Sequence, residues 1–435
     1  MSRLIFHKIV GKHNRSFHNP NNMGADKLPE IRDLSKVVEQ HLSGVRLLNY
    51  EISSLTQPGD NYGGTLFSVN ARLQGPDEKL FEEQLVAKVP PTDPYYWQFF
   101  QPERTCLTEN AVYKILAPAL AILQDDAGIP TEDQFKGFAR YYGSRECLDS
   151  SSSKVDQNAV LLLENLRSSG YVPGQRLRPY DLPHTLLALQ YMAEFHALPL
   201  AMRLLKPVLF REQVQPFFEK FDWHAAAPES KALMKNETLE DIRRATNNDS
   251  KMVDRIKKLS DEFFEFLAAA PDRPDGPFCS IIHCDFWINN LMFLYDGSGT
   301  PIDLKIIDFQ TAQYDSVVHD IISFLLSSVD TAILEIHFEH LLEAYYMAFV
   351  SCLRRVGADL AIHTYETFRA EVKRVAYIQV PHAIFMTRFI LADSVENETA
   401  ETRELLNVLK SPGSERISRK LSQILHLAQK FDILY

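Results

Sequence analysis

The sequence predicts an α+β protein with two lobes, an antiparallel β-sheet lobe followed by a larger, mainly helical lobe. Short apolar segments separated by turn residues recur between about residues 45 and 166, as in a sheet. From Pro183 onward, apolar residues recur mostly at helical spacing. The chain has 435 residues, enough for two interlocked lobes, and no repeat or long linker separates them. We expect a flexible basic tail over residues 1–27, the sheet lobe over 28–166 and the helical lobe over 167–435.

Composition and charge exclude several classes of protein. A hydrophobic fraction of 45% and a charged fraction of 24% are average for folded soluble proteins, so we expect neither a disordered nor a collagen-like chain. The formal net charge of −11 repels phosphate backbones, and we therefore expect no nucleic-acid partner. No uninterrupted apolar run approaches the roughly 18 residues of a membrane span, so we expect no membrane span.

The cysteines and the N-terminal segment bear on the compartment. Five scattered cysteines without a C-x-x-C pair suit reduced thiols inside the cell and indicate neither a disulfide nor a zinc site. Residues 1–25 contain basic but no acidic residues, which resembles a mitochondrial presequence only weakly. We expect a cytoplasmic protein with an untargeted tail, mitochondrial targeting being the minor alternative, and no obligate protein partner.

The first lobe is predicted to begin with an amphipathic helix over residues 28–42, where apolar positions recur at helical spacing. Turn-rich residues 57–64 then separate one strand from another over 65–73, which β-branched residues favour. Beyond a Gly-Pro-Asp-Glu turn, residues 83–89 predict a third strand that carries Lys88 and ends at two prolines. These signals describe strand, Gly-rich turn, strand, turn, strand.

A helix and two more strands complete the predicted first lobe. Residues 104–116 have helical character and place Glu109 and Tyr113 one turn apart on one face. Residues 138–142 and 159–163 are short strands separated by a serine-rich loop. The lobe should therefore contain a five-stranded antiparallel sheet.

One segment interrupts the helical pattern of the second lobe. Residues 291–295 and 302–307 are short apolar strands, and Asp-Gly-Ser-Gly at 296–299 joins them as a β-hairpin. The octapeptide His-Cys-Asp-Phe-Trp-Ile-Asn-Asn, residues 283–290, precedes this hairpin, and Asp308 follows it.

The strongest functional signal is this combination of Asp285, Asn290 and Asp308, which has the spacing of phosphoryl-transfer catalysts. A loop would hold Asp285 where it accepts the proton of an attacking hydroxyl. Asn290 would turn its amide oxygen toward Mg²⁺, and the hairpin would return Asp308 to the same ion. Hard oxygen ligands are what Mg²⁺ prefers. Alternatively, Asp285 caps a loop and Asp308 forms a turn, but the joint spacing favours the catalytic interpretation.

Two neighbours of this motif are interpreted as structural. His283 is expected to hydrogen-bond backbone groups and shape the loop rather than to react or to bind metal. Asp320, twelve residues after Asp308, is expected to be a buried brace whose carboxylate accepts N–H bonds from the catalytic loop.

Three features of the first lobe would bind nucleotide. Lys88 and Glu109 are a candidate ion pair that would hold the ammonium against the α- and β-phosphates, although a strand lysine is more often an exposed surface group. The Gly-rich turn could close over phosphates with backbone N–H donors, an ordinary hairpin turn being the alternative. The end of the fifth strand would enter the cleft, where backbone groups could pair with an adenine edge. The residues concerned are Asn61, Tyr62, Gly63 and Gly64 in the turn, and Glu164, Asn165 and Leu166 at the strand end.

These residues together resemble the choline-kinase-homologue, or ecdysteroid kinase-like, family, within the aminoglycoside phosphotransferase-like, protein-kinase-like superfamily. The likeness covers roughly residues 45 to 400. It is carried by Asn61-Tyr62, Leu85-Val-Ala-Lys88, Glu109 with Tyr113, Leu163-Glu-Asn-Leu166, His283 to Asn290, and Ile307-Asp-Phe-Gln310. The Phe-Trp inside the catalytic loop and the Asp-Phe-Gln ending separate this group from protein kinases.

The resemblance implies a protein-kinase-like fold and the cofactors ATP and Mg²⁺. It implies phosphorylation of a small-molecule hydroxyl acceptor, such as an ecdysteroid or a hydroxylated xenobiotic. By the same resemblance, Asp285 is the base, Asn290 and Asp308 are the magnesium ligands, Lys88 orients phosphate and Glu109 is its partner.

Two positions depart from the family pattern, and two other functions are considered. Gly63-Gly64 stands where the family often has Ala-Ser, and Cys284 stands where it has glycine. A catalytically silent protein of the same fold would bind a lipophilic ligand or a partner. A hydrolase could use Ser151-Ser-Ser-Lys154 as a Ser-x-x-Lys pair, but that motif lies in a polar run with no oxyanion-hole signal nearby.

Overall fold

The computed structural model describes residues 31–55, 64–149, 151–152, 154–220, 228–269, 275–391 and 414–434. The predicted tail over residues 1–27 lies outside these residues, as do Asn61, Tyr62 and Gly63 of the predicted phosphate-binding turn. Residues 32–435 form one unit. The boundary between lobes at residue 166 stays a prediction.

A five-stranded antiparallel sheet lies in the first part of the chain, in the order β1-β2-β3-β5-β4, which confirms the prediction. Its strands are β1 (Arg46–Ser54), β2 (Thr65–Gln74), β3 (Leu80–Val89), β4 (Tyr141–Arg145) and β5 (Val160–Glu164). In β3, Lys88 lies opposite Leu66 on one side and Leu161 on the other. Both neighbouring strands hydrogen-bond to β3, so the backbone that carries Lys88 is fixed.

The fourth strand begins three residues later than predicted. We expected it over 138–142, but Phe138 precedes β4 and packs against Phe309, with ring centroids 5.5 Å apart. Its hydrophobicity therefore serves a contact with the second lobe rather than the sheet. Within β4, a Cβ at Gly143 would lie only 2.6 Å from the carbonyl oxygen of Val37, so the close approach of helix α2 (Leu34–His41) requires glycine here.

The predicted helix over 104–116 is the middle of a longer helical stretch. After α3 (Pro94–Phe100), the stretch consists of α4 (Pro102–Ala111), the π-helical turn η1 (Val112–Leu116) and α5 (Ala117–Asp126). Among the described residues, Pro102–Asp126 alone is long and apolar enough for a membrane span by length and composition. Half of the most apolar 18 residues of this stretch are buried inside the fold. The core helix of a folded protein can be equally long and apolar, so this is only a weak indication of a membrane span.

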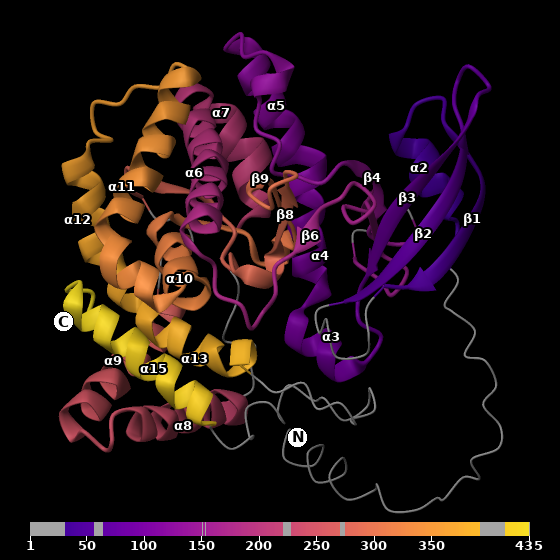
Figure 1. Cartoon of the computed structure of the whole chain (residues 1–435). Helices are drawn as coiled ribbons and strands as arrows, with labels where there is room; N and C mark the ends of the chain where they lie inside the picture. Colours follow the sequence, from indigo (N-terminus) through magenta and orange to yellow (C-terminus); the bar gives the residue numbers. More distant parts are fainter. Residues whose placement is uncertain are drawn as a thin grey trace, which may run out of the picture. The chain divides into compact units, whose positions relative to one another are not determined.

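The second part of the chain is mainly helical, as predicted. The longest helices are α6 (Leu182–Leu205) and α11 (Thr331–Arg355), which run side by side (Figure 1). The other helices are α7 (Pro207–Leu209), α8 (Pro228–Ala245), α9 (Ser250–Ala269), α10 (Val318–Ser328), α12 (Tyr365–Val375), α13 (Gln379–Leu391) and α15 (Glu415–Lys430). Short helical turns are η2 (Thr131–Asp133), η3 (Phe210–Val214), η4 (Gln215–Phe217), η6 (Ile288–Asn290), η7 (Phe309–Thr311) and η8 (Ala376–Ile378).

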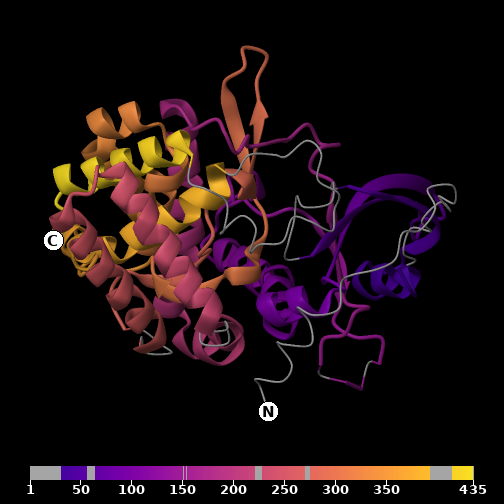
Figure 2. The ribbon, with the colours of Figure 1, turned by 90° about the horizontal axis from the view of Figure 1, so that it is seen from below.

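Two small sheets surround the catalytic motif. The predicted hairpin is confirmed as β8 (Leu291–Tyr295) and β9 (Pro301–Ile306), with β6 (Val172–Pro173) on the other side of β8. Figure 2 shows the hairpin as a pair of orange arrows. A second pair joins β7 (Cys279–Ile282) to β10 (Gln313–Ser316). Because β7 leads into the loop at 283–290 and β9 leads to Asp308, these sheets fix both ends of the motif.

Candidate active site

The structure brings Lys88, Glu109 and Asp308 together from three elements. Lys88 Nζ lies 2.6 Å from Glu109 Oε2 on α4 and 2.7 Å from Asp308 Oδ1, which follows β9. The side chains of Lys88 and Glu109 are only 12% and 5% exposed. The predicted Lys88–Glu109 ion pair is therefore confirmed as a contact, and Asp308 is a second partner of the same ammonium.

Burial and charge act in opposite directions on this cluster. Burial disfavours the Lys88 ammonium, but the Asp308 and Glu109 carboxylates outweigh it, so the pKa of Lys88 is raised. Burial raises the pKa of Glu109, and the nearby Lys88 opposes that rise. The ammonium is thus held charged between two carboxylates, which fixes its position.

The catalytic loop places Asp285 beside Asn290, the last residue of η6. Asn290 Nδ2 donates to the carbonyl oxygen of Asp285 at 2.8 Å and to its Oδ2 at 2.9 Å. Burial raises the pKa of Asp285 to about 7, and the charge of Asp308 adds to the rise, while hydrogen bonds from Asn290 and Trp287 oppose it. Asp285 therefore titrates near neutral pH, which suits a general base.

Asp320 braces the loop, as the sequence predicts. Its Oδ2 accepts the backbone N–H of His283 at 2.7 Å, and its Oδ1 accepts that of Cys284 at 2.8 Å. Burial disfavours this carboxylate, but the hydrogen bonds from the His196 ring and from the His283 backbone hold the pKa of Asp320 below its ordinary value. The buried charge is stabilised because its hydrogen bonds are made by the loop itself.

His283 has the structural role that we predict for it. Its Nε2 lies 2.9 Å from the carbonyl oxygen of Ile307, and its Nδ1 accepts the backbone N–H of Asp285 at 3.3 Å. Nε2 must then carry the proton, and burial lowers the pKa of His283, so the ring is neutral. The ring thus ties the loop to the strand that leads to Asp308.

A column of rings connects the helix of Glu109 to the catalytic loop. Tyr113, one turn after Glu109, packs edge-on against Phe309 at 5.9 Å between centroids, and Phe309 packs against His283 at 4.9 Å. All three rings are buried. Glu109 and Tyr113 lie on one face of the helix, as the helical spacing predicts. This face therefore positions Glu109 for its ion pair with Lys88 and Tyr113 for its contact with Phe309.

Asn290 and Asp308 are the two donors that the sequence predicts for magnesium, and Asp285 is the predicted base. The described residues contain no group of three or more His, Cys, Asp or Glu side chains arranged to hold a metal ion. The predicted set instead consists of carboxylate and amide oxygens that a substrate phosphate would complete. The charge of Asp308 raises the pKa of Asp285, because the two carboxylates repel each other. A divalent cation bound nearby would relieve this repulsion. The residues fit Mg²⁺ by their chemistry, and their roles as ligands stay a prediction.

The structure describes only part of the backbone that the sequence predicts to bind nucleotide. At Gly64, a Cβ would lie 2.7 Å from the carbonyl oxygen of Val89, so glycine is needed where this turn approaches the end of β3. This explains the departure from the family pattern at Gly64. At the other predicted contact, Glu164 ends β5, the N–H of Asn165 donates to Gln84, and the carbonyl of Leu166 accepts from Tyr171. Adenine recognition at this strand end stays a prediction.

The second departure lies in the catalytic loop. Cys284, which replaces the glycine of the family, has a φ of 67°. Only glycine adopts this left-handed region at little cost, so the cysteine is held there against its preference. The two hydrogen bonds to Asp320 are made by this residue and the one before it, and they supply part of the restraint.

The sequence did not predict the two residues, His196 and Tyr345, that connect Asp320 to helices α6 and α11. His196 on α6 contacts Asp320, and Tyr345 on α11 contacts His196. Their only sequence signal is a histidine and a tyrosine within apolar helices, which more often indicates core.

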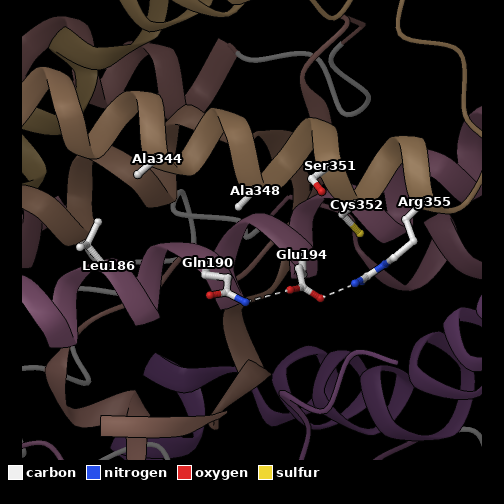
Figure 3. Close-up of a pocket in the computed structure, with 8 residues that line it drawn as sticks. All are labelled: Leu186, Gln190, Glu194, Ala344, Ala348, Ser351, Cys352 and Arg355. Carbon is white, nitrogen blue, oxygen red and sulfur yellow. Dashed lines mark hydrogen bonds and ion pairs between the residues drawn. The ribbon is translucent and has the colours of Figure 1, made fainter. Parts of the chain in front are cut away.

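Two cavities lie among the described residues around these elements. A small one of about 20 Å³, enough for one water molecule, adjoins Lys88, Cys106, Glu109 and Gln310. A groove of about 360 Å³ lies between α6 and α11 and contains the Glu194–Arg355 ion pair, 3.1 Å long (Figure 3). No residue of the catalytic loop lines that groove, so it is separate from the candidate active site.

A comparison with protein families agrees with this geometry. No curated protein matches the chain. The model of the ecdysteroid kinase-like family matches residues 58–358, a span that contains Lys88, Glu109, Asp285, Asn290 and Asp308. Because that span is more than half of the chain, the protein belongs to the ecdysteroid kinase-like family.

Proposed function

We propose that this protein is an ATP-dependent small-molecule kinase that transfers the γ-phosphoryl group to a hydroxyl of a lipophilic alcohol. Family membership indicates a kinase-like small-molecule phosphotransferase. The acceptor class, an ecdysteroid or a hydroxylated xenobiotic, is the finer part of the proposal. The observation that supports it most is the cluster in which Lys88 lies 2.6 Å from Glu109 and 2.7 Å from Asp308, beside an Asp285 whose pKa is about 7.

Each residue of the cluster has a chemical task in this proposal. Lys88 binds phosphate oxygens, and Glu109 keeps its ammonium in place. Asn290 and Asp308 would hold Mg²⁺, which supplies positive charge to the phosphates when bound. Asp285 orients the acceptor hydroxyl and takes its proton on a carboxylate oxygen. Its pKa near neutrality lets it stay ionised in a large fraction of molecules and still accept that proton.

Replacement of Asp308 tests the proposal. The variant Asp308→Asn keeps the side-chain shape but loses one charge, so we expect Mg²⁺-dependent turnover to be lost while the melting temperature stays near that of the wild type. Lys88 keeps its contact with Glu109 in this variant. The matched control is Asp296→Asn in the exposed turn of the same hairpin, where the carboxylate accepts only local bonds from Ser298 and Thr300. Unchanged turnover in Asp308→Asn would remove the proposed metal site.

A thermal-shift measurement separates the enzyme from a catalytically silent binder. MgATP should raise the melting temperature of the wild type but not that of Asp308→Asn. A response to hydrophobic ligands alone would favour the silent binder. A screen of hydroxylated steroids and small alcohols with labelled ATP then identifies the acceptor.

The surroundings of the protein are part of the same proposal. We propose a cytoplasmic protein without a membrane span that acts on its acceptor without an obligate protein partner. Fractionation of cells that express the tagged protein tests the location, and association with membranes or mitochondria would contradict it.

A further inference from the structure

We propose that His196 and Tyr345 are positioning residues of the catalytic loop, acting through Asp320. This inference rests on the proposed function, because it assigns these residues to the rate of phosphoryl transfer. Neither residue belongs to the sequence motif, and they come from α6 and α11, far along the chain from each other.

The two side chains form a buried line of contacts that ends at Asp320. Tyr345 OH lies 2.8 Å from His196 Nδ1, and His196 Nε2 lies 3.1 Å from Asp320 Oδ2. His196 and Tyr345 have no exposed surface, and Asp320 is 1% exposed. Water therefore cannot replace either contact.

The chemistry of the partners fixes where the protons lie. An ionised Asp320 can only accept hydrogen bonds, so His196 must carry its proton on Nε2. In the singly protonated ring Nδ1 has a free lone pair that can accept the hydroxyl proton of Tyr345. Asp320 thus sets the tautomer of His196, and the hydroxyl of Tyr345 holds the ring in the orientation in which Nε2 faces Asp320.

The same carboxylate holds two successive amides of the catalytic loop. His283 N–H and Cys284 N–H donate to the two oxygens of Asp320 at 2.7 and 2.8 Å. Cys284 lies at φ 67°, a conformation that this side chain does not favour, so the loop needs that restraint. The next residue is Asp285, and its N–H donates to the ring of His283. A shift of Asp320 is therefore transmitted to the proposed base.

A second contact ties α6 to the strand before the loop. Ser280 Oγ on β7 donates to the carbonyl oxygen of His196 at 2.6 Å. His196 is thus connected to the loop indirectly, through Ser280 on the preceding strand and through Asp320. This makes α6 the element against which the position of the loop is set.

The experiment compares substitutions at both positions in the full chain. His196→Leu removes the donor to Asp320, His196→Gln keeps an N–H that can reach it, and Tyr345→Phe removes only the hydroxyl. The matched control is Tyr346→Phe on the same helix, whose hydroxyl donates to the carbonyl oxygen of His363, outside this line of contacts. Labelled ATP and a hydroxylated steroid serve as substrates, with folded fraction checked by circular dichroism.

We expect a fall in kcat with little change in the KM for ATP. A misplacement of the base by about 1 Å costs on the order of 100-fold, so His196→Leu should lose about that factor, and His196→Gln should recover most of it. Tyr345→Phe should lose a smaller factor, and Tyr346→Phe should match the wild type. The proposal is overturned if folded His196→Leu retains wild-type kcat, if His196→Gln recovers none of the loss, or if the two tyrosine variants behave alike.

Hydrogen exchange separates this inference from the proposed function. In His196→Leu the amides of His283 and Cys284 should exchange faster than in the wild type and in Tyr346→Phe, whether or not an acceptor has been found. Absence of phosphoryl transfer by the wild type would overturn the proposed function alone. Unchanged exchange of these two amides would overturn the positioning role alone.

Discussion

The variant Lys88→Met tests whether the buried charge cluster is arranged as described. Lys88 lies between Glu109 and Asp308, and Glu109 is 5% exposed. Methionine keeps the length and apolar contacts of the stem but removes the ammonium. Glu109 then remains buried beside Asp308 with no positive partner from position 88.

The magnitude follows from the loss of one partner of a buried ion pair. Such a change costs about 3–5 kcal/mol when the remaining charge is uncompensated. Glu109 can reduce this cost by binding a proton, because its pKa is already raised by burial and loses the opposing effect of Lys88. The folded-state pKa of Glu109 then lies further above the unfolded value near 4.5. The folded protein binds this proton more tightly, so the variant loses stability as pH rises from about 4.5 through the raised pKa.

The assay is urea unfolding of wild type and Lys88→Met across this pH range. We expect similar stabilities at the acidic end and a growing deficit of the variant toward alkaline pH. The double variant Lys88→Met/Glu109→Gln removes the isolated charge and should recover most of the stability without recovering turnover. A Lys88→Met deficit that is absent, or that does not change with pH, would refute the description of Glu109 as a buried charge held by Lys88.

Three further predictions concern single residues. Asp285→Asn should lower kcat by about 10²- to 10⁴-fold at wild-type stability, measured by transfer from labelled ATP, and a smaller loss would remove Asp285 as the base. The pKa of His382 is lowered to about 4 by burial, so the unfolded chain binds a proton that the folded chain does not between pH 6.5 and 4. Wild-type stability should therefore fall by up to about 1.4 kcal/mol per pH unit on acidification in this window, and His382→Gln should flatten that slope in urea titrations. The hydroxyl of Tyr113 is buried with no hydrogen-bond partner among the described residues, so Tyr113→Phe should raise the unfolding free energy by about 1 kcal/mol, and a clear loss would reveal a hidden partner.

Much of the fold follows from local signals. Turn residues and short apolar segments predict the five strands, and helical spacing predicts the second lobe. The prediction of a strand over 138–142 is wrong at its start, because Phe138 does not belong to the sheet. Its ring packs instead against Phe309, which lies 171 positions further along the chain. A pattern within a short window cannot distinguish these two uses of an apolar side chain.

Part of the candidate site could likewise be predicted from local sequence, and part could not. The spacing of Asp285, Asn290 and Asp308 predicts a catalytic loop followed by a hairpin. This was possible because the loop and the hairpin lie within one short stretch of chain. Contacts between distant segments could be predicted only where a motif connects them. The contact of Lys88 with Glu109 was predicted in this way, whereas Asp308, 220 positions from Lys88, is a second partner that the sequence did not predict. His196 and Tyr345 are 149 positions apart, and no motif joins them, so only the folded chain shows their contact.

The ring of Phe309 has a consequence for regulation. Phe309 is fully buried between Tyr113, Phe138, Phe195 and His283. Asp308 could leave Lys88 by an outward swing of this segment only if that ring left its place, which would expose an aromatic side chain and open a void that its neighbours cannot fill. An on–off movement of the kind that many signalling enzymes use is therefore unfavourable in this chain. Under the proposed function, the rate of phosphoryl transfer should therefore follow the amount of protein made and the supply of ATP and acceptor.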